Sequence, residues 1–430
     1  MSEFVIRGGR CVHGVHRSPG NKNAALPMLA ACLLTDETVT LRNLPVIRDV
    51  ETMLCILDGL GVRIDRKGHQ VSLCSKGIRK RVPDPALCRQ VRTSLLFAGP
   101  LAARHGKAVI ARPGGDSIGR RRFDTHLDGL RQLGIEIGRN TKGSCTFLRK
   151  TLAAADILLD EASVTATENI IMAAVLAPGT STLFNAACEP HVQDLCRMLQ
   201  AMGASITGIG TNRLVINGVE KLHGVNHRIA SDTIETASFV AAAILTGGEL
   251  TVENIETEDF RVIQKHWAKL GITLQTDGAL LYVPPNQTLH IHNDFGAAIP
   301  KIEDGPWPNF PSDLLGVTLV LATQATGTIL LFEKMFESRM YFVDRMIDMG
   351  ARIVQCDPHR VVVSGPAKLQ ATRLHSPDIR AGISLLLAAL CAHGESRIGN
   401  ADMIDRGYEA VDRKLRHLGA DIRRIRRSAT

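Results

Sequence analysis

The sequence predicts an α/β protein of two domains, built from six copies of one repeat. Its 430 residues exceed the size of one ordinary domain. Hydrophobic residues make up 45% of the chain and aromatic residues only 4%, so the core must be built from Ala, Leu, Ile and Val. Two short phrases recur in step along the whole chain, which is the signature of a repeat architecture.

The first phrase is Leu or Met, then Gly, then a small or branched residue, and an aliphatic residue two positions later. It occurs six times, with successive glycines 73, 69, 68, 79 and 69 residues apart. The glycines are Gly61, Gly134, Gly203, Gly271, Gly350 and Gly419. Each follows an amphipathic stretch such as HVQDLCRMLQAMG, which predicts a helix that ends at a glycine cap. A hairpin pattern such as ITLQTDGALLYV follows five of the copies, whereas the sixth ends the chain.

The second phrase is a stretch of small and aliphatic residues, followed by a polar turn and a strand. TASFVAAAILTGGELTVENI is one of its six copies. A helix that is apolar on nearly all sides must be buried. Each repeat of roughly 70 residues therefore reads βαβαββ, with one buried and one amphipathic helix.

The starts of the buried helices carry polar residues. The expected starting pairs are Lys22-Asn23, Arg92-Thr93, Glu168-Asn169, Glu235-Thr236, Ser312-Asp313 and Asp378 with Arg380. Carboxylates and hydroxyls are ordinary helix N-caps. Cations at the positive end of a helix dipole are unfavourable, so Lys22, Arg92 and Arg380 suggest a bound anion; each alone could also be a solvated loop residue.

Charge and cysteine usage restrict the class of protein. The net charge of +8 suits an anionic small molecule, a nucleic acid or an acidic surface. The ten cysteines contain no Cys-x-x-Cys pair, and residues such as Cys32 and Cys391 lie in apolar runs, as expected in a reducing compartment. The start of the chain has no signal-peptide pattern, and polar residues interrupt the longest apolar run, 314–332. We expect a soluble, cytoplasmic protein with no membrane partner.

Two further classes of function are weakly supported. Cys11, His13 and His16 form the nearest approach to a metal pattern, but no second cluster completes a zinc site, so no metal and no cofactor are expected. Arginines at the end of the chain, in 423–427, could contact a nucleic acid. The other arginines are dispersed and aromatic residues are scarce, which disfavours nucleic-acid binding.

Six phrases carry a resemblance that runs almost from end to end. They are KNAALP (22–27), RPGGDSIG (112–119), SVTATENIIMAA (163–174), NFPSDL (309–314), FESR (336–339) and IDRGYE (404–409). By these phrases the chain resembles the enolpyruvyl transferases of the EPSP synthase superfamily, in particular the branch that uses UDP-N-acetylglucosamine. The sister enzyme that makes enolpyruvylshikimate phosphate typically has Lys-Ser where this chain has Lys22-Asn23. RNA 3′-phosphate cyclase has related repeats but is shorter, and the count of six disfavours it.

The resemblance implies a particular fold. It is a two-domain inside-out α/β barrel of six βαβαββ repeats, three per domain, with helices inside, sheets outside and the active site between the domains. The expected N-terminal domain is 22–231 and includes a mobile catalytic loop, 112–122. The expected C-terminal domain combines 1–21 with 232–430.

The resemblance also implies an activity. Enolpyruvyl is transferred from phosphoenolpyruvate to the 3-hydroxyl of UDP-N-acetylglucosamine by addition and elimination, with release of phosphate, in the first committed step of peptidoglycan synthesis. A phosphate and a carboxylate need several cations. The implied phosphoenolpyruvate-binding residues are Lys22, Asn23, Arg92, Arg121, Arg339, Arg380 and Arg406.

Three residues take catalytic roles by the same resemblance. Asp116 stands at the general-acid position, where many members have Cys and a minority Asp, so insensitivity to fosfomycin is expected. Its carboxyl must stay protonated to act as an acid. Asp313 matches the base, and Lys22 completes the set. The plainer alternatives are a turn residue for Asp116 and an N-cap for Asp313.

Acceptor binding is implied for a second set of residues. They are Asn23, Arg92, Arg121, Asp124, His126, Ser163, Val164, Thr165 and Asp313. The chain departs from the commonest family pattern at Glu161, Arg122, Thr165 and Thr233. Transfer to a different nucleotide or phosphorylated acceptor, or a non-catalytic paralogue, therefore remains an alternative.

Overall fold

The chain forms two compact units. The computed structural model describes residues 2–115, 118–119, 121–139 and 143–426. The C-terminal unit consists of Met1–Pro19, Ser117–Arg120 and Ser231–Thr430, and the N-terminal unit of Gly20–Asp116 and Arg121–Ala230. By this division the chain passes from one unit to the other after residues 19, 116, 120 and 230.

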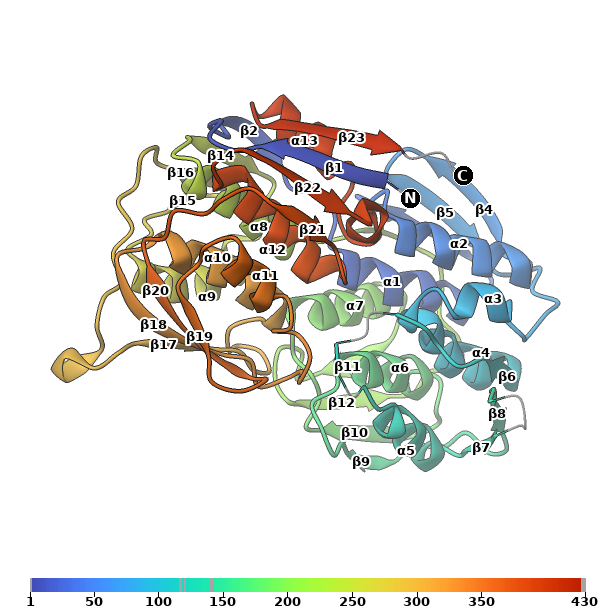
Figure 1. Cartoon of the computed structure of the whole chain (residues 1–430). Coiled ribbons are helices and arrows are strands. Elements are labelled where there is room, and N and C mark those ends of the chain that lie inside the picture. The colour runs from blue at the N-terminus through green and yellow to red at the C-terminus, as the bar shows by residue number, and fades with distance from the viewer. Residues whose placement is uncertain (1, 116–117, 120, 140–142, 427–430) are drawn as a thin grey trace. The chain divides into compact units, whose positions relative to one another are not determined.

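Three sheets belong to the N-terminal unit (Figure 1), named here in hydrogen-bonded order. The first is β13 (Val225–Arg228), β3 (Thr38–Arg42), β5 (Gln70–Cys74) and β4 (Arg63–Lys67). The second is β6 (Lys107–Ile110), β8 (Cys145–Arg149) and β7 (Ile135–Arg139). The third is β11 (Ser205–Thr207), β12 (Arg213–Asn217), β10 (Thr180–Phe184) and β9 (Asp156–Leu158).

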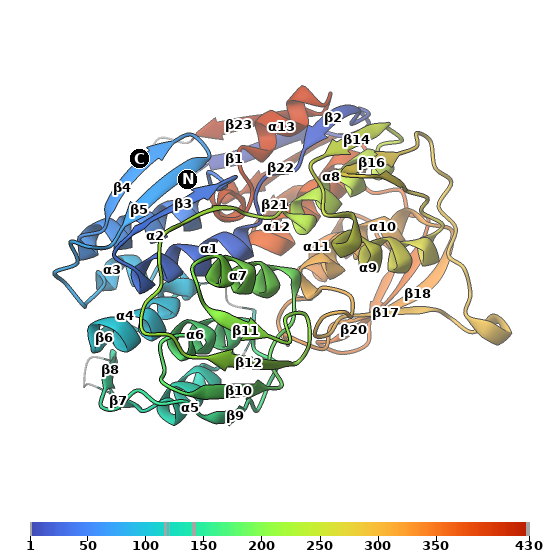
Figure 2. The ribbon, with the colours of Figure 1, turned by 180° about the vertical axis from the view of Figure 1, so that it is seen from behind.

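Three sheets also belong to the C-terminal unit (Figure 2). The first is β15 (Gln275–Asp277), β16 (Leu280–Val283), β14 (Leu250–Glu253) and β2 (Gly14–Arg17). The second is β17 (Lys301–Glu303), β18 (Gly327–Phe332), β20 (Arg360–Gly365) and β19 (Ile353–Gln355). The third is β21 (Arg373–His375), β22 (Glu395–Gly399), β1 (Ser2–Arg7) and β23 (Asp421–Arg426).

Two classes of helix follow the predicted alternation. The helices with mostly buried residues are α1 (Lys22–Ala31), α4 (Ala98–His105), α6 (Val164–Ala174), α8 (Thr233–Leu245), α10 (Leu315–Gln324) and α12 (Ile379–Cys391). The amphipathic ones are α2 (Arg48–Leu60), α5 (Asp124–Gln132), α7 (Pro190–Ala201), α9 (Thr257–Trp267), α11 (Val343–Asp348) and α13 (Val411–His417). Short helices complete the set: α3 (Pro85–Cys88), η1 (Cys32–Leu34), η2 (Arg92–Phe97), η3 (Ala268–Leu270), η4 (Phe295–Ala297), η5 (Ser312–Leu314) and η6 (Ala401–Arg406).

One repeat shows the predicted order in full. The elements β9, α6, β10, α7, β11 and β12 follow one another along the chain. Strands β9 and β10 are parallel and are joined through the buried helix α6, while β10, β12 and β11 pair antiparallel. This is the βαβαββ unit, and apolar residues of α6 such as Ile170 and Met172 lie in the core.

The first and fourth repeats exchange their first strands. Strand β1, at the start of the chain, completes the sixth repeat. Strand β2 precedes α1 in sequence but pairs with β14, whereas β13 precedes α8 and pairs with β3. Strand β1 lies between β22 and β23 and pairs antiparallel with both. It supplies the strand that the sixth copy lacks.

The predicted helix starts are correct in four places and wrong in two. Glu168-Asn169 and Glu235-Thr236 do not precede their helices but lie inside α6 and α8. Helix α8 starts earlier because Asp232 is its N-cap. The side chain of Asp232 accepts hydrogen bonds from the backbone N–H groups of Ile234 and Glu235. Helix α6 starts after Ser163.

All six repeat glycines lie just after an amphipathic helix and have positive φ, between 76° and 101°. Gly61, which caps α2, has φ 99°, and a Cβ atom there would lie 3.0 Å from the carbonyl oxygen of Gly77. Gly59 is an exposed residue of the same helix with no atom within 4 Å of such a Cβ.

We therefore expect opposite effects of alanine at these two glycines. Gly61→Ala should lower the free energy of unfolding by about 1 kcal/mol, because an L-residue is strained in the left-handed region. Gly59→Ala should raise it by about 0.5–1 kcal/mol, because glycine is a poor helix former. Urea unfolding of both variants measures the difference. Equal effects at the two positions would contradict the assignment of Gly61 as a helix terminator.

Candidate active site

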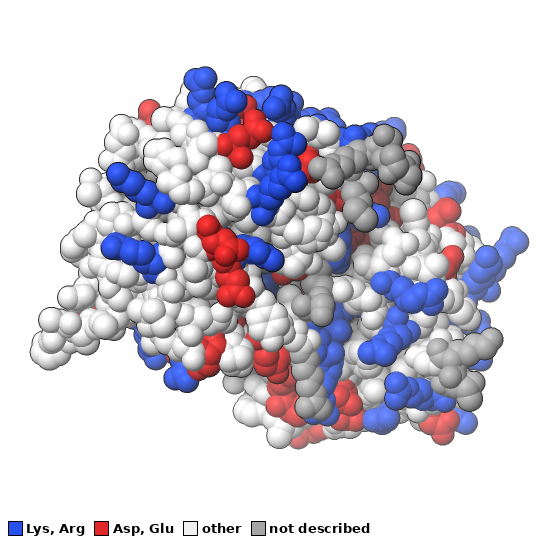
Figure 3. Space-filling view, viewed as in Figure 1, with Lys and Arg blue, Asp and Glu red and all other residues white. Residues whose placement is uncertain are grey.

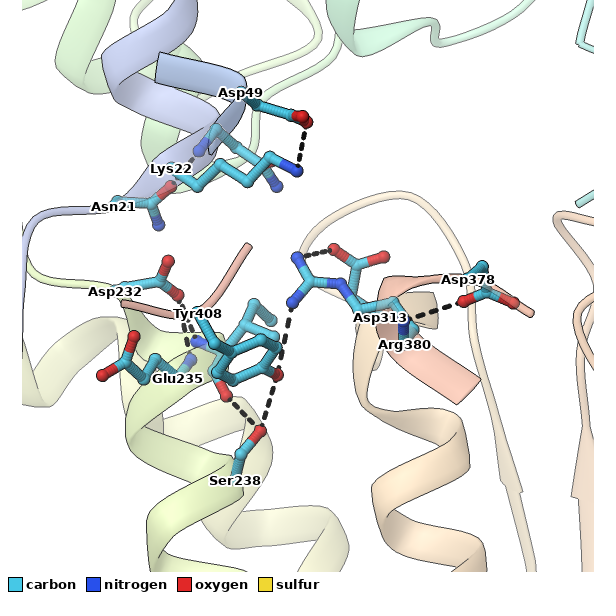
Figure 4. A network of polar contacts seen from close by, with 12 residues as sticks. Asn21, Lys22, Asp49, Asp232, Glu235, Ser238, Asp313, Asp378, Arg380 and Tyr408 are labelled. Carbon is cyan, nitrogen blue, oxygen red and sulfur yellow. Dashed lines mark hydrogen bonds and ion pairs between the residues drawn. The ribbon is translucent and has the colours of Figure 1, made fainter. Parts of the chain in front are cut away.

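Lys22 lies at the first position of α1, as expected. The side chain of Asn21 caps this helix by accepting hydrogen bonds from the backbone N–H groups of Asn23 (2.7 Å) and Ala24 (3.1 Å). The Nζ atom of Lys22 lies 2.8 Å from Oδ2 of Asp49 on α2, and both side chains are nearly buried (Figure 4). A carboxylate of the protein therefore faces this cation and fixes its position.

Arg92 lies at the start of η2 and close to a second arginine. Its Nη2 atom donates to the backbone carbonyls of Arg121 (2.9 Å) and Arg122 (3.1 Å). Its guanidinium lies 5.6 Å from the ring centre of Phe123. Burial and the charge of Arg121 lower the pKa of Arg92 to about 10, against a smaller opposing effect of Glu161. Two cations that destabilise each other's charge favour a bound anion.

His126 lies at the buried face of α5 and contacts the start of α6. Its Nε2 atom is 3.0 Å from Oγ1 of Thr165, and its Nδ1 atom is 3.2 Å from Nδ2 of Asn169. Asn169 also joins this site to the neighbouring helix, because its amide donates to the carbonyl of Leu95 and accepts from Gly99 N–H. Burial, with a smaller effect of Arg92, lowers the pKa of His126 to about 3. The imidazole is therefore neutral at physiological pH.

The structure thus brings together two of the acceptor residues named from the sequence, His126 and Thr165. Asn169 was missed: in the sequence it was assigned only to a helix start. An amide inside an otherwise apolar helix is the signal that could have found it, because a buried amide needs partners.

Asp124 and two departures from the family pattern, Arg122 and Glu161, lie around the start of α5, whereas Thr165 lies in α6 and Thr233 is the first residue of α8. Arg122 Nε lies 2.5 Å from Oδ2 of Asp124, so this arginine has a local carboxylate partner. The hydroxyl of Thr125 donates to Asp160 at 2.6 Å and lies 3.5 Å from Glu161. Ser163 is the N-cap residue of α6, and Val164 is the first residue of that helix.

Asp313 lies between two arginines of the C-terminal unit. Arg380 Nη2 donates to Oδ2 of Asp313 at 2.7 Å (Figure 4). Arg339 Nη2 donates to Oδ1 of Asp313 at 3.0 Å. The side chain of Asp313 is 24% exposed, whereas those of Arg339 and Arg380 are 8% and 12% exposed. The carboxylate is thus held by charge-assisted hydrogen bonds and still reaches the surface.

The expectation that Asp313 acts as an N-cap is wrong. Pro311 occupies the N-cap position of η5, and Asp313 is the second residue of that short helix. Its carboxylate is directed to side chains far along the chain, which no local pattern can reveal.

Tyr408 contacts Arg380 and helps to hold its guanidinium in place. Its hydroxyl lies 3.3 Å from Nη1 of Arg380 and 2.8 Å from Oγ of Ser238. Burial raises the pKa of Tyr408 to about 12, so it stays neutral. Burial disfavours the charged form of Arg380, but Asp313 and Tyr408 outweigh it and raise its pKa.

Arg406 is the last residue of η6, and both ends of the chain hold this helix. Arg424 of β23 donates to the two carboxylate oxygens of Asp405 at 2.6 and 2.7 Å. The backbone N–H and hydroxyl of Ser2 donate to Asp402 at 2.9 and 2.7 Å. The segment that carries Arg406 is therefore anchored on either side.

Asp116 lies outside the described residues. The described part of its loop starts against α3: Gly114 N–H donates to the carbonyl of Cys88, and a Cβ atom at Gly114 would lie 1.7 Å from the carbonyl oxygen of Arg89. Only glycine fits there. Gly115 and Gly119 have positive φ of 111° and 116°.

Comparison with known proteins decides the family. The model of the family described as EPSP synthase (3-phosphoshikimate 1-carboxyvinyltransferase) matches residues 6–415. The chain belongs to this family of enolpyruvyl transferases. UDP-N-acetylglucosamine 1-carboxyvinyltransferase of Borreliella burgdorferi is 51% identical over 99% of this chain and 100% of its own length. The proteins of that name from Bradyrhizobium diazoefficiens and Bacteroides thetaiotaomicron are 48% and 46% identical, over 98% and 99% of this chain and 98% and 100% of their own lengths.

Solved enolpyruvyl transferases share the fold. NikO from Streptomyces tendae matches with a TM-score of 0.88 at 23% identity, covering 98% of each chain. EPSP synthase from Acinetobacter baumannii matches with a TM-score of 0.77 at 18% identity, covering 99% of this chain and 100% of its own. The predicted fold, an inside-out α/β barrel of six βαβαββ repeats in two domains, is confirmed.

The described residues contain neither a candidate metal site nor a candidate membrane-spanning helix. No group of three or more His, Cys, Asp or Glu side chains in residues 2–115, 118–119, 121–139 and 143–426 could hold a metal ion. None of the helices in that part of the chain has the length and hydropathy to cross a bilayer.

Proposed function

We propose that this enzyme transfers enolpyruvyl from phosphoenolpyruvate to the 3-hydroxyl of UDP-N-acetylglucosamine and releases phosphate. The observation that carries the proposal is the carboxylate of Asp313, held between Arg339 and Arg380 and still partly exposed. The relatives that share 44–51% of its residues over their whole length bear the name of this activity. By this activity it would supply peptidoglycan synthesis, and hence cell shape and division.

The binding roles are proposed as follows. Phosphoenolpyruvate is held by Lys22, Asn23, Arg92, Arg121, Arg339, Arg380 and Arg406. The UDP-sugar is held by Asn23, Arg92, Arg121, Asp124, His126, Ser163, Val164, Thr165 and Asp313. Arginines suit the phosphate and carboxylate of phosphoenolpyruvate because each can donate two parallel hydrogen bonds.

Three residues carry the chemistry in this proposal. Asp116 gives its proton to C3 of phosphoenolpyruvate, and Asp313 takes the proton of the sugar hydroxyl as its oxygen attacks C2. The C–O bond to phosphate then breaks as Asp313 passes this proton to the leaving phosphate oxygen. Asp313 next takes a methyl proton, which re-forms the double bond, and proton exchange with water returns Asp313 and Asp116 to their starting states. Lys22 stabilises the negative charge of the phosphate as it leaves.

The domain roles are part of the same proposal. Residues 22–231 form the N-terminal enolpyruvyl transferase domain, with 112–122 as its mobile catalytic loop, and residues 1–21 and 232–430 form the other. We place the enzyme in the cytoplasm. All ten cysteines are free, as in proteins of reducing compartments.

Acceptor choice can be tested by phosphate release. We expect phosphate from phosphoenolpyruvate with UDP-N-acetylglucosamine, and none with UMP or shikimate 3-phosphate. A preference for another acceptor would point to the departures at Glu161, Arg122, Thr165 and Thr233 and would overturn the assignment. No release with any acceptor, despite a folded protein, would favour a non-catalytic paralogue.

We propose no nucleic-acid partner, because the arginines are dispersed in the sequence and aromatic residues are scarce. On the face in Figure 3, Lys and Arg side chains are interspersed with uncharged residues and with Asp and Glu.

A further inference from the structure

A second carboxylate, besides that of Asp313, lies close to Arg339. It belongs to Glu333, which follows strand β18 and is 0% exposed. Its Oε1 atom accepts hydrogen bonds from the backbone N–H groups of Met335 (3.1 Å) and Phe336 (3.0 Å). Its position is therefore fixed by its own chain.

Glu333 lies close to two neighbours of Asp313, Ser312 and Arg339. The hydroxyl of Ser312, the residue directly before Asp313, donates to the carboxylate of Glu333 at 2.9–3.0 Å. Arg339 Nε lies 3.7 Å from Glu333 Oε2, while Nη2 of the same guanidinium lies 3.0 Å from Asp313 Oδ1. The guanidinium thus lies between two carboxylates, and its centre is 5.0 Å from the ring centre of Phe336.

Another buried carboxyl group, that of Asp304, affects the charge of Glu333. It is 1% exposed, and its Oδ1 accepts the backbone N–H of Lys334. Burial and the neighbouring Asp304 raise the pKa of Glu333. The carboxyl group of Glu333 therefore holds a proton more readily than an ordinary glutamate does.

Other charged or titratable groups lie near these residues. His359 Nδ1 contacts the backbone carbonyl of Glu333, and Lys334 pairs with Glu303. Tyr408 and Asp232 act on Arg380.

We propose that Glu333 is a positioning residue for Asp313, acting through Ser312 and Arg339. The inference rests on the proposed role of Asp313 as the base. By competing for the charge of Arg339, the Glu333–Asp304 pair lessens the stabilisation of the Asp313 carboxylate. Asp313 is therefore a stronger base than it would be if Arg339 interacted with Asp313 and with no other carboxylate.

The double variant Glu333→Gln/Asp304→Asn tests the proposal. It keeps the shape of the pair and an acceptor for Ser312, but removes the negative charge that the two carboxyl groups can carry. The Asp313 carboxylate is then favoured, so the acid limb of the pH profile of kcat/KM should move to lower pH, by about half to one unit. A purely structural role of the pair would change the melting temperature without moving the limb.

Glu303→Gln is the matched control. Glu303 is next to Asp304 in sequence but pairs with Lys301 and Lys334, and we expect its acid limb to match that of the wild type. An unmoved limb in a folded double variant, or an equal movement in the control, would overturn the inference. Ser312→Ala, which removes only the hydroxyl, should lower kcat with little effect on the position of the limb.

Failure of the proposed function is distinguishable from failure of this inference. A wild-type profile without an acid limb, or with a limb that Asp313→Asn retains, would remove Asp313 as the base. A ¹³C NMR titration of the Asp313 carboxyl, assigned with the Asp313→Asn variant, measures the same electrostatic coupling without turnover. Its midpoint should fall in the double variant; an unchanged midpoint would contradict the coupling itself.

Discussion

Replacing Asp313 by Asn should lower kcat by about 10²- to 10⁴-fold, the range by which a general base accelerates a reaction. The amide retains the shape of the carboxylate but cannot take the proton of the attacking hydroxyl. KM for phosphoenolpyruvate should change less, because Arg339 and Arg380 remain. Steady-state rates of phosphate release measure both quantities.

The same substitution should also lower the melting temperature, because two nearly buried guanidinium groups lose their shared counter-charge. Asp344→Asn is the control: Asp344 is an exposed carboxylate at the start of α11, and its loss should leave turnover unchanged. If Asp313→Asn melts at a lower temperature yet turns over near the wild-type rate, Asp313 is only a structural anchor.

The wild-type enzyme should resist fosfomycin, and Asp116→Cys should become sensitive to it. A thiolate opens the epoxide of fosfomycin, whereas a carboxyl held protonated for acid catalysis is a much weaker nucleophile. A thiol at this position can still protonate C3, so the variant should retain activity. Intact mass after incubation should show one adduct on Asp116→Cys and none on the wild type.

Asp116→Ala separates catalysis from local structure in this loop. Without an acid, kcat should fall by about 10²- to 10⁴-fold. Unchanged turnover would make Asp116 a turn residue outside the chemistry. An adduct on wild-type protein at another residue would show that the ten free cysteines, rather than residue 116, decide sensitivity.

Much of the fold could be predicted because its signals are local and repeated. The six glycines after amphipathic helices report a backbone conformation that other residues rarely adopt, and all six have it. Apolar helices such as α8, buried from Ile234 to Ile244, follow from composition alone. The exchange of β2 and β13 between sheets agrees with the domain bounds that the resemblance implied, 22–231 and 1–21 with 232–430, but no local pattern in the sequence indicates it.

The site could be predicted only in part, and by resemblance more than by pattern. Cations at helix starts were visible in the sequence, but their partners were not: Asp49 faces Lys22 from the next helix, and Asp313 faces Arg380 from 67 positions away. Glu333 has no local signal, because its function depends on contacts that exist only after folding. Side-chain pairs of this kind are set by tertiary packing.

The place of β1 between β22 and β23 has a consequence for synthesis. Residues Ser2–Arg7 leave the ribosome long before their partners, because the hydrogen bond from Ser2 to Asp402 spans 400 positions. During translation, domains fold as units once their residues are available, so the N-terminal unit is complete long before the other. Phe4, Val5 and Ile6, all buried in the finished protein, must wait unpaired for most of that time. The nascent chain thus carries an exposed apolar strand, a binding site for chaperones and a starting point for aggregation if the final repeat is delayed.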